Sequence, residues 1–173
     1  MKITFLTTAL VFAANNVLSQ HAHGTNAVTE TGQSQFAAIA EIVTVLRDDP
    51  KTNWAKVNID ALRDHLMDMD AVTTQARVHK TVTDLRITFT ITGTGAVSPS
   101  IQRMVLAHSP MLKNATDWTL TAARIENGAT MTLLATSQDE LTQILGLGFF
   151  GLMTIGAHHQ GHHLMIAKGH SPH

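Results

Sequence analysis

Apolar residues recur at helical spacing in two segments in the first half of the chain. Residues 35–48 carry an apolar residue every three or four positions, which predicts a helix. Pro50 ends this helix, because proline cannot continue it. A second helix is predicted to begin at Asn58, a residue suited to the N-cap position, and its apolar stripe runs beside His65. We expect the two helices, which span residues 35–72 with a short link, to form an antiparallel hairpin.

From residue 77 onwards, apolar and polar residues alternate instead. The alternation around Phe89 predicts a strand with one exposed face, since every second residue is apolar. Val78 and Val82 fall on the opposite parity, which leaves either a bulged strand or a hairpin that turns near residues 83–84. We prefer the hairpin.

A helix and a second hairpin follow. Pro99 marks the first position of this helix, which is expected to stop near Pro110. Asn127-Gly128 is the strongest hairpin-turn signal in the chain, and a strand is predicted on each side of it. Residues 137–140 match a capping box, so the final helix is predicted to begin there. The predicted fold class is α+β: an N-terminal helical hairpin followed by two ββα units, with a mostly antiparallel sheet, helices packed on one face and a long C-terminal helix.

The final helix is predicted to run unbroken to Lys168, about 31 residues or about 46 Å. A short strand covers less than half of that length, so the C-terminal half is expected to pack on the helical hairpin that carries His65. On a helical wheel that starts at Leu141, the apolar face continues into histidines. These are His159, His162 and His163, with His158 at the edge of the stripe. The glycines of this segment are expected to allow close approach of a neighbouring element.

Four histidines within six residues form two pairs spaced four apart, and such a pair on one helix can reach the same metal ion. The predicted ligands are His65, His158, His159, His162 and His163. Asp68 or Met69, one turn beyond His65, could add a fourth ligand to three histidines. Imidazole sites suit zinc, copper, nickel or iron, and methionine would favour copper. The expected cofactor is therefore copper or zinc.

The alternative interpretation is structural. Burying an imidazole without a partner costs roughly 1–3 kcal/mol, and hydrogen bonds among these histidines or with Asp64 or Asp68 would offset that cost. Positive charge at a helix end would also suit the helix dipole. His79 and His108 stand alone in the sequence pattern and are expected to be structural.

One histidine from an early helix, followed by an HxxxH pair on the last helix, resembles the DinB-like metal-binding bundles. The matching residues are His65 with either His158/His162 or His159/His163. The resemblance implies metal binding by these residues, and it covers these positions alone. The two predicted β-hairpins depart from a four-helix bundle, so we do not carry over the fold or the activity of that family.

The N-terminus has the pattern of an export signal. Residues 1–19 are predicted to be a signal peptide, because Lys2 precedes an apolar run that is too short to span a membrane. Residues 20–33 are predicted to be a flexible polar segment, residues 34–169 a single α+β domain, and residues 170–173 a histidine-containing tail. The expected localisation is the periplasm in a Gram-negative cell and the extracellular space otherwise.

Composition excludes one class of metal ligand and one class of partner. The chain has no cysteine, which excludes thiolate ligands, and its formal net charge of −1 offers no electrostatic basis for nucleic-acid binding. The leading hypothesis is an exported metal-binding protein that sequesters, transports or senses copper or zinc. One alternative is a non-catalytic structural or interaction protein with structural or pH-responsive histidines, and a homo-oligomer is compatible with either. The other is a metal-dependent hydrolase with Asp64 or Asp68 as its base, which ranks last because no catalytic signature accompanies them.

Overall fold

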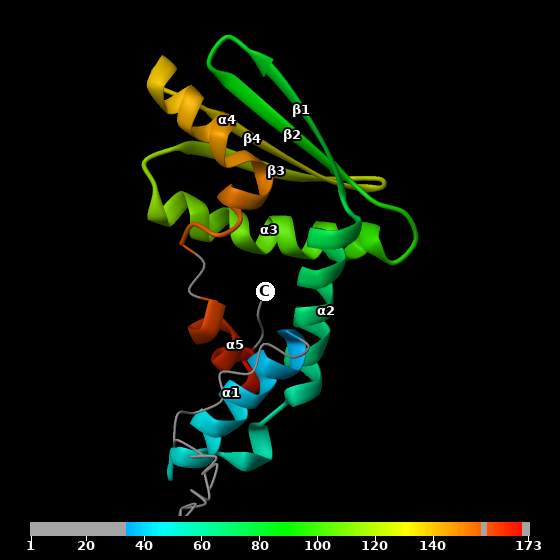
Figure 1. Ribbon diagram of the computed structural model, residues 1–173, viewed down its shortest axis with the longest axis vertical. Coiled ribbons are helices and arrows are strands. Elements are labelled where there is room, and N and C mark those ends of the chain that lie inside the picture. Colours follow the sequence, from blue (N-terminus) through cyan, green and yellow to red (C-terminus); the bar gives the residue numbers. More distant parts are fainter. Residues whose placement is uncertain (1–33, 157–158, 171–173) are drawn as a thin grey trace, which may run out of the picture. The chain divides into compact units, whose positions relative to one another are not determined.

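The computed structural model of the chain describes residues 34–156 and 159–170 (Figure 1). Within them the elements follow in this order: α1 (Ser34–Asp48), η1 (Trp54–Lys56), α2 (Ile59–Gln75), β1 (Arg77–Thr83), β2 (Arg86–Thr92), α3 (Val97–Ala115), β3 (Thr119–Ile125), β4 (Gly128–Leu134), α4 (Gln138–Leu152) and α5 (His159–Ala167). The predicted signal peptide, the predicted polar segment 20–33, His158 and residues 171–173 lie outside the described residues. The α+β class and the order of a helical hairpin followed by strand–strand–helix units are confirmed.

The four strands form an antiparallel sheet in the order β1-β2-β4-β3. The predicted hairpin between β1 and β2 is confirmed, with Thr83 paired to Arg86. Asp84 takes a positive φ of 54° in the connecting turn, a conformation that aspartate tolerates better than most residues. The second predicted hairpin joins β3 to β4, and Ile125 pairs with Gly128 across its turn.

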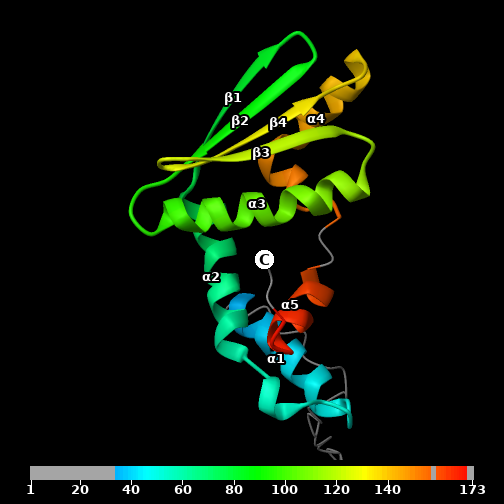
Figure 2. The same cartoon turned by 180° about the vertical axis from the view of Figure 1, so that it is seen from behind.

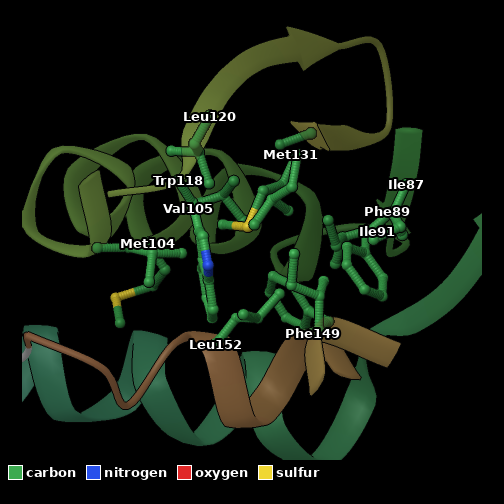
Figure 3. Packing of buried hydrophobic residues seen from close by; sticks show 14 of the residues in the cluster. Ile87, Phe89, Ile91, Met104, Val105, Trp118, Leu120, Met131, Phe149 and Leu152 are labelled. Atoms are coloured by element: carbon green, nitrogen blue, oxygen red, sulfur yellow. The ribbon is translucent and has the colours of Figure 1, made fainter. Parts of the chain in front are cut away.

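One face of the sheet packs against α3 and α4, as predicted. The buried residues of β2 and β4 alternate with threonines, so that Phe89 and Met131 point into the core while Thr88 and Thr132 share a hydrogen bond of 3.0 Å on the other face. Figure 3 shows the core from close by, with Phe149 of α4 beside the side chains of β2. We call this core the sheet cluster.

A second apolar core joins α1, α2 and α5, which lie together in both views of the chain (Figures 1 and 2). Its buried members are Ile42, Leu46, Leu62, Leu66, Ile166 and Ala167, and we call it the helical cluster. The end of α5 is tied to the link between α1 and α2, because Asn58 N–H donates to the Ala167 carbonyl at 2.8 Å. An ion pair of 3.6 Å between Lys168 and Asp49 adds to this attachment.

The prediction of one continuous C-terminal helix is wrong, because the chain forms two helices there, α4 and α5. Gly148 is non-helical, with φ 59° and ψ −178°, and Gly156 has a φ of 71°. Gly156 also lies so close to α3 that a Cβ would stand 2.6 Å from the Met111 carbonyl oxygen. The close approach of a neighbouring element, expected for the glycines of this segment, therefore occurs at Gly156. Gly148 and Gly156 also interrupt the predicted continuous helix.

The helix expected to stop near Pro110 continues to Ala115, because α3 accommodates the proline and buries Leu112 in its last turns. None of the helices in the described ranges combines the length and the apolar character that a membrane crossing requires.

Candidate metal centre

Five histidines from three helices gather where the two apolar cores meet. We call them the histidine cluster: His65 from α2, His108 from α3, and His159, His162 and His163 from α5. On α2, His65 lies between Leu62 and Leu66 of the helical cluster. On α3, the neighbours of His108 at helical spacing belong to the sheet cluster. The histidines therefore occupy core positions of their helices.

The position of His65 follows from the local sequence of α2. The side chain of Asn58 caps this helix by accepting a hydrogen bond of 2.9 Å from Ala61 N–H, as predicted. The cap fixes the start of the helix and thus the direction of its buried stripe. His65 lies on that stripe and is only 5% exposed. The helix that carries it was predicted correctly, and so was the inward direction of the imidazole.

Three of the rings contact one another pairwise. The ring centre of His65 lies 4.9 Å from that of His162 and 6.3 Å from that of His108, and His108 lies 6.2 Å from His162. Two imidazoles bound to one tetrahedral ion have ring centres about 5 Å apart, given metal–nitrogen bonds of about 2 Å. The His65–His162 pair matches this separation, and the other two pairs exceed it by about 1 Å.

His159 and His163 extend this group. His163 lies 5.5 Å from His65, His159 lies 6.2 Å from His108, and the two are 6.2 Å from each other. This is the predicted pair spaced four apart on the last helix. Among residues 34–156 and 159–170, no three side chains with metal-binding groups already converge on a common point as a bound ion would require. Binding of one ion by three or four of these rings would therefore draw the wider pairs together by about 1 Å.

Hydrogen bonds define which nitrogen carries the proton on two of the rings. His108 Nδ1 lies 2.9 Å from the Met104 carbonyl oxygen, and His163 Nδ1 lies 3.2 Å from Oε1 of Gln160. Both oxygens only accept hydrogen bonds, so on each ring Nδ1 carries the hydrogen and Nε2 carries the lone pair. Metal-binding histidines commonly show this arrangement, in which the nitrogen away from the ion donates to a carbonyl or carboxylate.

Three rings of the cluster favour the neutral form of imidazole, which is the form that binds metal. Burial, together with the nearby charges of His159, His162 and His108, lowers the pKa of His163 to about 4. Burial also lowers the pKa of His108, although its hydrogen bond to Met104 acts in the opposite direction, and burial lowers the pKa of His159. These three rings are therefore unprotonated at neutral pH and compete little with protons for a metal ion.

The carboxylates considered as a further ligand or base are held by arginines. Arg103 donates to both oxygens of Asp68 at 2.7 Å, and Ser100 donates to one of them at 2.7 Å. Burial would raise the pKa of Asp68, but the hydrogen bonds from Arg103 and Ser100 outweigh it and the pKa is lowered. Asp64 is exposed and pairs with Arg63 at 3.0 Å. Asp68 is thus directed towards α3, and the candidate centre consists of imidazoles.

Two openings reach the histidine cluster from the surface. An open groove of about 780 Å³ runs along α2 and α3, and His65 is among its lining residues. A smaller one of about 280 Å³ is lined by His163, Leu66 and Met69. Met69, the other residue predicted as a fourth ligand, is partly buried and lines the same opening as His163.

Four of the five predicted site residues, His65, His159, His162 and His163, are brought together, and the fifth, His158, lies outside the described residues. His108 was expected to stand alone, yet it contacts three members of the cluster. Its spacing from Ile101 and Met104 on the buried stripe of α3 is the sequence signal that could have indicated an inward direction. His79 is exposed on β1, and His170 is exposed after α5.

The chain matches no protein-family model, no curated protein and no solved structure.

Proposed function

We propose that this is an exported copper- or zinc-binding protein whose ion is held by the histidine cluster, for sequestration, transport or sensing of the metal. The observation that carries the proposal is the proximity of His65, His108 and His162. These three buried imidazoles come from three different helices and lie with ring centres 4.9–6.3 Å apart. A chance excess of histidine in α5 would not place buried histidines of α2 and α3 beside it.

The donor set supports this choice of metals. Neutral imidazole nitrogens suit zinc and copper, whereas calcium and magnesium prefer oxygen ligands. Asp68, a carboxylate considered as a ligand, is engaged by Arg103 and Ser100. Met69, which lines the same opening as His163, would favour copper if its sulfur joined the ligands. Export remains a prediction from residues 1–19, and N-terminal sequencing of the protein from its native host tests it.

Metal titration tests the proposal directly. The purified protein without the predicted signal peptide is titrated with Cu(II), Cu(I) and Zn(II), and the variant His65→Gln with His162→Gln is compared with the control His79→Gln. We expect binding tighter than micromolar for at least one ion, a loss of at least about 100-fold in the double variant, and no change in the control. Circular dichroism confirms that each variant is folded. Binding weaker than micromolar for all three ions, or equal binding by wild type and the double variant, contradicts the proposal.

The lowered pKa of His163 supports a second candidate, a structural or interaction protein with pH-responsive histidines. In that case acid would change the association or folding of the protein, and metals would have no effect. The hydrolase alternative is less favoured, because Asp64 and Asp68, its candidate bases, pair with Arg63 and Arg103.

A further inference from the structure

We infer that Gln160 and Glu41 are positioning residues that fix the tautomer of His163 and thereby make its Nε2 atom a ligand of the metal ion. This inference rests on the proposed metal-binding function. It adds a fourth helix, α1, to the site, since Glu41 lies on α1 while the three histidine-bearing helices are α2, α3 and α5.

The hydrogen bonds form a chain from the surface to the buried ring. Gln160 Nε2 donates to Oε2 of Glu41, and His163 Nδ1 lies 3.2 Å from Oε1 of Gln160. A carboxylate can only accept, so Glu41 orients the Gln160 amide with its NH₂ group towards α1. The amide oxygen must then face the ring, and the ring must carry its proton on Nδ1. Glu41 thus determines, through Gln160, that the lone pair of His163 is on Nε2.

The Nε2 atom that this chain leaves unprotonated is suited to bind an ion. It is buried and has no hydrogen-bond partner among the described residues. The ring is 4% exposed, and its centre lies 5.5 Å from that of His65, close to the separation of about 5 Å for two ligands of one ion. A buried polar atom without a hydrogen-bond partner requires an explanation, and a bound ion would provide one.

Gln160 and Glu41 are both exposed. They contact each other although they are 119 residues apart in sequence. Neither contributes to the apolar cores. Their contact is therefore explained by the orientation of His163 better than by packing. Loss of such an outer hydrogen bond typically weakens metal affinity by 10–100-fold, because the ligand loses its fixed tautomer and orientation.

The first test measures the tautomer in the metal-free protein. Nuclear magnetic resonance of ¹⁵N-labelled histidine at neutral pH is expected to show a proton on Nδ1 of His163 in the wild type. In Gln160→Met this preference should be lost, while His108, whose Nδ1 donates to a backbone carbonyl, keeps its tautomer and serves as an internal reference. Gln143→Met is the matched control, because Gln143 is also exposed on a helix.

The second test measures metal affinity. We expect Gln160→Met to bind the ion about 10–100-fold more weakly and Gln143→Met to bind it as the wild type does. Gln160→Glu alone places two carboxylates together, and their repulsion should turn the new side chain away from His163 and weaken binding. Combining it with Glu41→Gln exchanges the two partners and keeps both hydrogen bonds, so affinity should return to within about threefold of wild type.

The outcomes distinguish a failure of the proposed function from a failure of this inference. If the wild type binds no metal, the proposed function and this inference both fail. If the wild type binds metal, but Gln160→Met changes neither the tautomer of His163 nor the affinity, only the inference is overturned. Failure of the exchanged pair to restore affinity, with the protein folded, also overturns it.

Discussion

Acidification of the metal-free protein should reduce its stability through His163. Its pKa is about 4 in the folded chain, against an ordinary value of 6.5. Between these values the unfolded chain binds a proton that the folded chain excludes, so the free energy of unfolding falls as pH decreases from 6.5 towards 4. The contribution is fully present above pH 6.5, and about 2 kcal/mol of it is lost by pH 5. His108 and His159, whose pKa values are also lowered, add losses of the same sign.

Urea unfolding in the presence of a chelator measures this effect. The change in unfolding free energy between pH 7.5 and pH 5 is determined for wild type, His163→Gln and the control His79→Gln. Comparing the changes removes the pH-independent cost of each substitution and the acid response of the carboxylates. His163→Gln should lose about 2 kcal/mol less than wild type, and His79→Gln should match wild type. If wild type and His163→Gln respond within about 0.5 kcal/mol of each other, the assignment of a buried neutral His163 is refuted.

Three further predictions follow from the cores and the helix ends. A metal ion at 100 times its Kd should raise the unfolding free energy by about 2.7 kcal/mol and slow amide exchange in residues 160–164, and unchanged exchange there would contradict the α5 ligands. Gly156→Ala should destabilise by at least about 1–2 kcal/mol in thermal unfolding, because a Cβ would meet Met111, whereas Gly146→Ala, with open space around it, should not destabilise. Arg103→Met should cost about 1–3 kcal/mol in urea unfolding by leaving a partly buried Asp68 without its partner, and a change under about 0.5 kcal/mol would refute this role.

Much of the fold was predictable because it depends on contacts close in sequence. The N-caps at Asn58 and Ser137 each accept a hydrogen bond from the backbone N–H three residues on, and both are present. The change of parity after Val82 reflects a hairpin, since the turn at Asp84 brings adjacent strands together. Periodicity also indicated the buried face of β2, because side chains on a strand alternate between two faces whatever the strand packs against.

In the C-terminal segment, the pattern of neighbouring residues did not predict the break between α4 and α5. Glycine costs a helix only about 1 kcal/mol per residue, so sequence alone did not distinguish a glycine-rich helix from a broken one. The close approach of Gly156 to Met111 of α3 accompanies the break, and that contact is tertiary. The helical wheel therefore does not extend from Leu141 to the histidines. His162 and His163 are buried because α5 docks on α1 and α2.

By itself, the sequence determined the α+β class, the helix and strand order, and the concentration of imidazoles near the C-terminus. These depend on residue type and on spacings of two to four positions. Only the tertiary structure decided that His108 joins the cluster and that Glu41 reaches Gln160, because these contacts link residues 51 and 119 positions apart. Separations of that size carry no periodic signal, and the packing of whole helices decides which side chains meet.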